Sequence, residues 1–280
     1  MWKWAIVLLF IALATGYFLR FLLYVPNFES SSAGVSSLSS ALEDNAAWTP
    51  LFNGEDLENW IAKFSGYPLG VNHRDTFRVE DGLLSVSYAD YEQFDGEFGV
   101  LFYQQEYSHY ILRLEYRFVG EQVPGGPSWA FRNSGVMLHS QAPKTIPLDS
   151  DFPVSIEAQL LGGADEGERN TGNLCTPGTH VILQGQLHKF HCTNSMSKTY
   201  RGDQWVKAEF EVQGSGVIRH IINDELVIEY EQAQYDPDDA DAKTLMRGGG
   251  GRLISTGYIA LQAESHPVQF RNIEIHVLKP

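Results

Sequence analysis

The segment VSIEAQLL at residues 154–161 alternates between apolar and polar side chains. Successive side chains of a β-strand point to opposite faces of the sheet, so Glu157 and Gln159 must project from the same face. The other face carries only aliphatic residues: Val154, Ile156, Ala158 and Leu160. One apolar and one polar face are typical of a strand in an antiparallel sheet that covers a hydrophobic core.

Two further segments have the same period. YIALQAES at residues 258–265 places Gln262 and Glu264 on one face and aliphatic side chains on the other. In residues 134–140 the face opposite a valine and a leucine carries His139. A face that combines carboxylates, amides, histidine and aromatic rings suits a sugar, because polar groups pair with its hydroxyls and rings stack on its apolar side. The alternative is a solvated outer face, which is common in antiparallel sheets.

The same alternation recurs from Trp48 onward, and no segment there has a sustained helical period. Asp81-Gly82 and Asn223-Asp224 lie between alternating runs and predict two-residue hairpin turns. The remaining alternating segments are residues 76–80, 83–87, 110–119, 205–213, 217–230 and 268–277. About ten or more short strands with turn residues between them predict an all-β fold, one antiparallel β-sandwich.

The first 47 residues differ in composition from the rest. Residues 4–25 are apolar except for Arg20, and a spanning helix needs roughly 20 apolar residues. A cleaved signal peptide ending near Ala14 is the alternative. Either way the remainder is exported, so we expect a cell-envelope protein whose globular domain is periplasmic or extracellular and anchored to the membrane. The predicted parts are a signal-anchor or transmembrane helix at 1–25, a Ser-rich linker at 26–47 and a β-sandwich domain at 48–280.

Charge and cysteine content exclude several classes of protein. The chain of 280 residues has 20 Lys and Arg against 35 Asp and Glu, a formal charge of −15, which argues against nucleic acid as a partner. Two cysteines exclude a four-thiolate metal site. In an exported domain, Cys175 and Cys192 are expected to form a structural disulfide. Two buried free thiols are the alternative, because spacing alone fixes no pairing.

Two other segments resemble ligand sites only superficially. Residues 236–241 are rich in aspartate, but the segment lacks the glycine and the final glutamate of an EF-hand loop. We expect a solvated acidic loop, with adventitious calcium as the weaker alternative, and no cofactor. Residues 247–252 contain four glycines without the Gly-Lys-Ser/Thr of a phosphate-binding loop, which predicts a flexible loop.

Five motifs, in order along the chain, are similar to a known family. They are LFNGEDLENW at 51–60, VEDGLL at 79–84, NSGV at 133–136, IEAQL at 156–160, and LQAESHP at 261–267 followed by FRNI at 270–273. The chain resembles the 3-keto-disaccharide hydrolase domain family over about residues 48–280. The resemblance implies a jelly-roll sandwich of the concanavalin A-like lectin and glucanase type, and an enzyme that cleaves glycosides oxidised at C3. Many members have an arginine in place of His139 and a QDHG-like segment in place of residues 262–267.

A ketone at C3 acidifies the C2 hydrogen, so a base can start elimination of the C1 substituent, and water then adds. The candidate acid–base residues are Glu157, Glu264 and His266, with His139 in reserve. The candidate groups for binding the substrate or stabilising the oxyanion are Arg132, Asn133, His139, Gln159 and Gln262. Ordinary hydrolysis by the two carboxylates is the competing mechanism. A lectin-like module that binds carbohydrate without catalysis is the alternative function.

Overall fold

The computed structural model describes residues 47–249 and 251–280. Within them the chain folds into two antiparallel β-sheets packed face to face, which confirms the predicted all-β sandwich. The predictions for residues 1–46, a signal anchor and a Ser-rich linker, lie outside the described residues and stay predictions, as does the envelope location. None of the helices in 47–249 and 251–280 is long and apolar enough to cross a bilayer.

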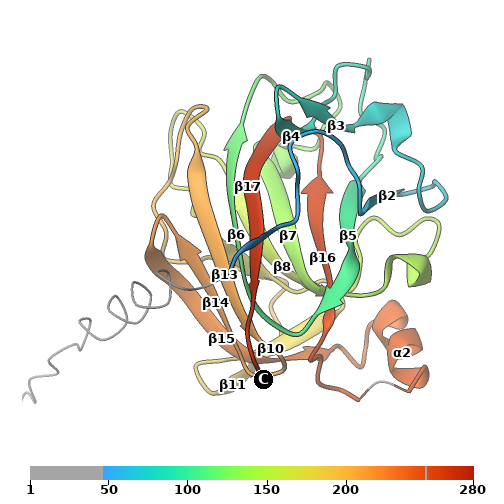
Figure 1. The fold of residues 1–280 in the computed structure, drawn as a ribbon, viewed down its shortest axis with the longest axis vertical. Coiled ribbons are helices and arrows are strands. Elements are labelled where there is room, and N and C mark those ends of the chain that lie inside the picture. Colours follow the sequence, from blue (N-terminus) through green and yellow to red (C-terminus); the bar gives the residue numbers. More distant parts are fainter. Residues whose placement is uncertain (1–46, 250) are drawn as a thin grey trace, which may run out of the picture. The chain divides into compact units, whose positions relative to one another are not determined.

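The larger sheet has ten strands. They are β1 (Thr49–Pro50), β3 (Phe77–Glu80), β4 (Leu83–Val86), β6 (His109–Phe118), β10 (Thr179–Leu183), β11 (Gln186–His188), β13 (Val206–Gln213), β14 (Val217–Ile222), β15 (Glu225–Tyr235) and β17 (Val268–Val277). Their order is β11-β10-β15-β14-β13-β6-β17-β4-β3, and β1 pairs with β17 beside this path. Figure 1 shows β6, β13, β14, β15 and β17 running side by side across the front of the molecule.

The smaller sheet has seven strands and carries the polar segments. They are β2 (Trp60–Phe64), β5 (Gly99–Tyr107), β7 (Asn133–Ser140), β8 (Ile156–Leu161), β9 (Asn173–Cys175), β12 (Cys192–Thr193) and β16 (Gly257–Ala263). Their order is β12-β9-β8-β7-β16-β5-β2. Strands β7, β8 and β16, which are far apart in sequence, are therefore neighbours in the middle of this sheet.

Both predicted two-residue turns are present. Asp81 and Gly82 have φ of 52° and 76°, and Asn223 and Asp224 have φ of 47° and 66°. Positive φ at both central positions is what a type I′ turn requires, and its twist matches that of the flanking strands. These turns join β3 to β4 and β14 to β15.

The main core lies between the sheets. It is built from the alternate aliphatic and aromatic residues of the strands, among them Leu112, Phe210 and Leu261, which are fully buried. Each such side chain contributes roughly 1.5–3 kcal/mol through burial. A second, smaller cluster lies on the other face of the seven-stranded sheet. It consists of Val100, Phe102, Met137 and Ala260.

A loop covers this second cluster, so the outer face of the seven-stranded sheet is not simply solvated. Ile146 packs against the cluster. Lys63 Nζ donates hydrogen bonds to the carbonyl oxygens of Phe64 at 2.7 Å and Leu148 at 2.9 Å. The ammonium group therefore ties the loop to the edge strand β2.

The prediction that no helix follows Trp48 was wrong in one place. Residues 240–247, partly within the expected acidic and glycine-rich loops, form helix α2 (Ala240–Arg247). Asp239 caps it by accepting a hydrogen bond from the amide of Ala242 at 2.8 Å. Eight residues make barely two turns, too few for a periodic pattern to be visible in the sequence. Three single-turn 3₁₀ helices, η1 (His73–Asp75), η2 (Ser128–Ala130) and η3 (Pro143–Thr145), complete the described elements.

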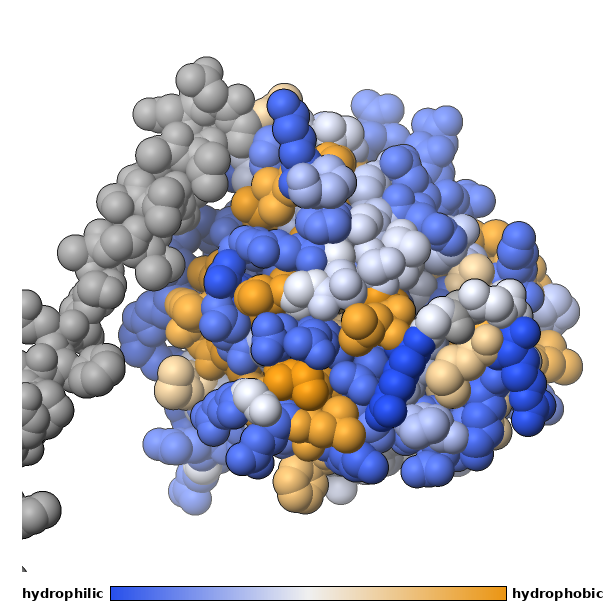
Figure 2. Space-filling model, turned by 90° about the horizontal axis from the view of Figure 1, so that it is seen from below, coloured by the Kyte–Doolittle hydropathy of each residue, from blue (hydrophilic) through white to orange (hydrophobic). Residues whose placement is uncertain are grey.

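Figure 2 shows the end of the sandwich seen from below, near α2 and the C-terminus in Figure 1. Hydrophobic residues are scattered there among hydrophilic ones. Mixed colouring of this kind is ordinary for a protein surface, since apolar atoms contribute much of any protein's exterior.

Candidate active site

The two strands with acid–amide pairs flank β7. The register pairs Gly135 of β7 with Gln159 of β8. It also pairs Val136 of β7 with Leu261 of β16. One step further along this antiparallel ladder, Gln262 lies opposite Gly135. Gln159, Gly135 and Gln262 therefore form a row across three strands, on the face turned away from the main core.

Gly135 is the point on which the polar side chains converge. A Cβ at this position would lie 2.8 Å from Gln262 Oε1 and 2.8 Å from Glu157 Oε1. The two oxygens are therefore no more than twice that distance apart. Real Cβ atoms do not make contacts this short, so the absence of a side chain at Gly135 is what admits the amide and the carboxyl.

Glu157 and Glu264 form a buried carboxyl pair, 7% and 3% exposed. Burial raises the pKa of Glu157 from 4.5 to about 8, because surroundings of low polarity disfavour the charged form. Burial also raises the pKa of Glu264, and the negative charge of Glu157 adds to the rise. The positive charge of Arg169 and the amide of Gln262 lower that pKa. Two interacting carboxyls titrate as a unit, so the pair holds a proton near neutral pH.

Arg169 closes one side of the site. Its Nη1 donates hydrogen bonds to the carbonyl oxygens of Phe131, of Gly162 at 2.9 Å and of Arg132 at 3.3 Å. Its Nη2 donates to the carbonyl oxygen of Trp129 at 3.2 Å. The guanidinium thus fixes the loop before β7 and brings a positive charge near Glu264.

His266 lies beside this guanidinium and is 1% exposed. Its ring packs edge-on against Phe118 and Phe131, with centroids 5.7 and 5.2 Å away. Burial, together with the positive charges of Arg132 and Arg169, lowers the pKa of His266 to about 4. The imidazole is therefore neutral at physiological pH, able to donate from one nitrogen and accept at the other.

Arg132 is half-buried next to His266. Its φ is 42°, and its Nη1 donates a hydrogen bond to the carbonyl oxygen of Gly202 at 2.9 Å. Its Nε is buried and has no hydrogen-bond partner among the described residues. Arg132 therefore retains a donor that an acceptor on a ligand would satisfy.

Unpartnered polar atoms gather at this site. Buried polar groups are normally hydrogen-bonded, and an isolated one costs about 1–3 kcal/mol. In the described part of the chain, ten buried side-chain atoms have no partner. Seven of them belong to the site: Arg132 Nε, Asn133 Oδ1, Gln262 Nε2 and Oε1, Glu264 Oε2, and His266 Nδ1 and Nε2. A concentration of this kind is expected where a polar ligand completes the hydrogen bonding.

His139 does not join the other predicted residues. Its φ is 49°, and the register between β7 and β16 is irregular beside it, between Tyr258 and Ala260. Its Nε2 lies 2.9 Å from the carbonyl oxygen of Gly214, in the turn between β13 and β14 of the other sheet. The bulge turns this side chain toward the sheet interface, so alternation assigned it to the wrong face.

The predicted disulfide is present between Cys175 and Cys192. It joins β9 to the two-residue edge strand β12. Cys175 is also the cross-strand neighbour of Glu157, so the two side chains share a face. The bond therefore secures the sheet edge immediately beside one carboxyl of the pair.

The aspartate-rich segment is occupied by structural contacts. Asp236 Oδ1 lies 3.3 Å from His180 Nε2 and accepts from the amide of Asp238 at 2.8 Å. Asp239 caps α2. No group of three or more His, Cys, Asp or Glu residues suited to a metal ion occurs within 47–249 and 251–280.

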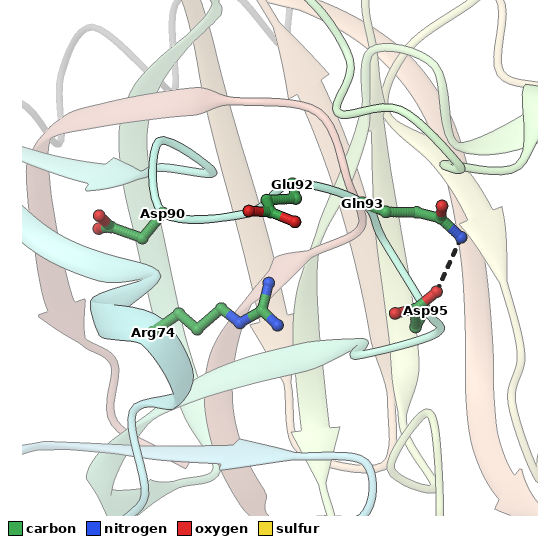
Figure 3. Close-up of a pocket in the computed structure, with 5 residues that line it drawn as sticks. All are labelled: Arg74, Asp90, Glu92, Gln93 and Asp95. Atoms are coloured by element: carbon green, nitrogen blue, oxygen red, sulfur yellow. Dashed lines mark hydrogen bonds between the residues drawn. The ribbon is translucent and has the colours of Figure 1, made fainter.

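A surface hollow lies apart from the predicted residues. Figure 3 shows Arg74 reaching from η1 toward the loop between β4 and β5, which supplies Asp90, Glu92, Gln93 and Asp95. Gln93 Nε2 donates a hydrogen bond to Asp95 Oδ1 at 2.9 Å. These side chains are exposed, all except Gln93 are charged, and none of them was predicted to act in the site.

Sequence reasoning missed Arg169 and Trp129. Arg169 lies in a loop and Trp129 in the single-turn helix η2, and neither is part of a segment whose period would reveal the direction of a side chain. Trp129 follows Gly125, Gly126 and Pro127, which signal only a turn. Arg169 is the one basic residue in an acidic stretch at 164–169. This isolated positive charge does not by itself indicate a site, and only the hydrogen bonds of the guanidinium show that Arg169 belongs to one.

Comparison with solved structures finds matches at low sequence identity, with TM-scores below 0.5. A candidate glycosyl hydrolase from Parabacteroides distasonis is 19% identical, with 83% of this chain and 100% of that chain covered and a TM-score of 0.49. A galectin-like protein from Bacillus subtilis is 12% identical, with 82% and 94% covered and a TM-score of 0.44. A β-glucanase from Bacillus licheniformis is 11% identical, with 84% and 99% covered and a TM-score of 0.43.

Comparison with curated proteins gave no match. The sequence model of one family, described as the 3-keto-alpha-glucoside-1,2-lyase-like domain, matches residues 47–276. This range covers the seventeen strands of the described residues, apart from Val277 at the end of β17. It also contains Glu157, Glu264 and the other residues of the site. The chain therefore belongs to the family of 3-keto-alpha-glucoside-1,2-lyase-like domains, the family that the sequence motifs predicted.

Proposed function

We propose that this protein cleaves glycosides whose sugar carries a ketone at C3, by elimination across C1 and C2 followed by addition of water. The observation that carries the proposal is the coupled, buried pair Glu157 and Glu264, on a sheet face that also presents two amides. Elimination needs one ionised and one protonated group at the same moment. A carboxyl pair whose two members lose their protons at different pH supplies both once Glu157, with a pKa of about 8, has ionised.

The reaction divides into proton transfers that these residues can perform. A base removes the C2 proton, and the electron pair forms an enolate with the C3 oxygen. The enolate expels the C1 substituent, whose oxygen takes a proton from the acid, and a C1–C2 double bond remains. Water then adds its hydroxyl to C1 and a proton to C2. The net change is hydrolysis of the glycosidic bond.

We assign the base to Glu157 and the acid to Glu264. Burial raises the pKa of both, and the pKa of Glu264 rises further because Glu157 lies nearby. The group that holds its proton more tightly is the better candidate for delivering one to the leaving oxygen. Glu157 then ionises first and serves as the base toward C2.

The remaining residues stabilise and orient the substrate. Arg132 Nε and His266 each offer an unpartnered polar atom beside the pair, suited to the oxygen of a developing enolate. Gln262 and Asn133 likewise hold unpartnered amide atoms, suited to sugar hydroxyls. Gln159 lies in the same row as Gln262 across β7.

The test uses the purified full chain with a 3-keto-disaccharide, the same compound deuterated at C2, and the unoxidised parent. We expect turnover of the 3-keto compound only, a slower rate with deuterium, and wash-out of deuterium into water. Cleavage of the unoxidised parent without a C2 isotope effect would instead indicate hydrolysis by two carboxylates. Saturable binding of all three without product would indicate a lectin-like module.

A further inference from the structure

Trp129 is an exposed aromatic residue at the edge of the site. Its side chain is 52% exposed, which is high for a tryptophan. It lies in η2, directly before the loop that carries Phe131 and Arg132. Its side chain has no role in the elimination described above.

The indole is held in place despite its exposure. It stacks on Phe98, with ring centroids 5.6 Å apart and an interplanar angle of 17°. Phe98 in turn contacts Phe94 and Phe152, with centroids 5.1 and 5.2 Å away. The carbonyl oxygen of Trp129 accepts a hydrogen bond from Arg169. One ring face is thus covered by Phe98, and much of the remaining surface is open to solvent on a fixed support.

This platform lies next to the carboxyl that we assign as the acid. Gly99 and Ala263 form the last pair between β5 and β16, and Phe98 and Glu264 are the residues just beyond that pair on the two chain segments, so they lie close together. Trp129 stacks on that phenylalanine. A group that stacks on the indole of Trp129 is therefore separated from Glu264, the proton donor for the leaving oxygen, only by the side chain of Phe98.

The polar and apolar parts of the site lie on different sides of Glu264. The amides of Gln159 and Gln262 follow the row through Gly135, where a sugar with hydroxyls finds partners. On the other side, Phe98 contacts two further aromatic rings, those of Phe94 and Phe152. The oxidised sugar is best accommodated over the amides, and a flat apolar group over Trp129.

We infer that Trp129 and Phe98 form a binding subsite for the leaving group, and that this subsite selects glycosides with an aromatic leaving group. The inference rests on the proposed function, because it takes the C1 substituent as the group that departs. Stacking on a fixed aromatic ring contributes to binding without requiring hydroxyl partners. The platform therefore discriminates between an aromatic ring and a small alkyl group.

The test compares phenyl and methyl 3-keto-glucosides with the full chain, Trp129→Ala, Trp129→Phe and the control Phe190→Ala. Phe190 is 74% exposed and stands between β11 and β12, away from the platform. We expect Trp129→Ala to raise KM for the phenyl compound about tenfold and to leave the methyl compound nearly unchanged. Trp129→Phe should recover most of the loss, and Phe190→Ala should match the wild type.

Calorimetry with the unoxidised phenyl and methyl glucosides separates this inference from the proposed function. If neither 3-keto compound is turned over, the proposed function fails. The subsite then still stands if the phenyl glucoside binds more tightly than the methyl glucoside and Trp129→Ala removes the difference. Turnover of both compounds with equal response to Trp129→Ala, or no response, would overturn the subsite while leaving the proposed function intact.

Discussion

Strands of both sheets alternate between apolar and polar residues, but the charged side chains on the two outer faces have different surroundings. On one face they form partly exposed ion pairs, and on the other they are buried. On the ten-stranded sheet, Arg113 pairs with Glu274 at 2.7 Å and Arg271 with Glu115 at 2.7 Å, with side chains between 26% and 39% exposed. On the seven-stranded sheet, Glu264 is buried and its Oε2 has no hydrogen-bond partner among the described residues.

The pKa values follow this difference. Partial burial works to raise the pKa of Glu115, but hydrogen bonds from Arg271 and Asn272 outweigh it, so the pKa is lowered. On the other sheet, burial of Glu157 meets no such opposition, and its pKa rises to about 8. Period-two alternation therefore locates a polar face but does not show whether that face is solvated. Whether the face is solvated depends on the loops that cover it and on the groups that pair with its side chains. A carboxyl buried without a paired cation is costly in folding free energy, so its presence indicates a function.

The largest expected effect is on turnover. Glu157→Gln and Glu264→Gln each remove a proton-transfer group while keeping the shape of the side chain. We expect kcat for a 3-keto-disaccharide to fall about 10²- to 10⁴-fold in each. Glu115→Gln, on the other sheet, is the matched control and should retain the wild-type rate. Equal losses in all three variants would show that the two faces do not differ in function.

The next effect is on stability, and it should have opposite signs on the two faces. Folded Glu157 keeps its proton between pH 4.5 and about 8, whereas the unfolded chain releases it, so stability falls as pH rises through this window. Glu157→Gln removes the dependence. A tenfold change in proton affinity corresponds to about 1.4 kcal/mol. We therefore expect the free energy of unfolding of Glu157→Gln at pH 9 to exceed that of the wild type by about 2–5 kcal/mol.

Denaturant unfolding at pH 5 and pH 9 measures this effect. At pH 5 the difference between wild type and Glu157→Gln should nearly vanish. Glu115→Gln should lose up to about 1 kcal/mol at pH 9, because it weakens a half-exposed ion pair. A Glu157→Gln variant that is less stable than the wild type at pH 9 would mean that the carboxylate is stabilised by its surroundings.

A smaller effect is expected at the sheet edge. Replacing both Cys175 and Cys192 by serine should lower the free energy of unfolding by about 2–4 kcal/mol. Because Cys175 neighbours Glu157 across the strands, a looser edge should also admit water and lower the pKa of Glu157. The pH profile of turnover would then move toward acid. An unchanged profile in a destabilised variant would show that the disulfide serves stability alone.

The fold could be predicted from the sequence because its signals are local. Asp81-Gly82 and Asn223-Asp224 specify type I′ turns, and alternation specifies which strand residues enter the core. Helix α2 escaped prediction because its eight residues are too few for a period and an aspartate cap also occurs in loops.

The site could be predicted only where it lies on regular strands. Glu157 and Gln159 share a face of β8, and Gln262 near the end of β16 is followed two residues later by Glu264, just past that strand. His139 was misassigned because one residue with positive φ ends the alternation of β7. Arg169 reaches the site from a loop and Trp129 from the single turn η2, and the course of such segments depends on contacts far apart in sequence.

The most direct test of the account is an NMR titration of the glutamate side-chain carboxyls, with Glu157→Gln and Glu264→Gln used for assignment. The account predicts that at least one of the two stays protonated at neutral pH, and that the pKa of Glu264 falls in Glu157→Gln because a neighbouring charge is gone. Two carboxyls that titrate independently near the ordinary value of 4.5 would contradict it.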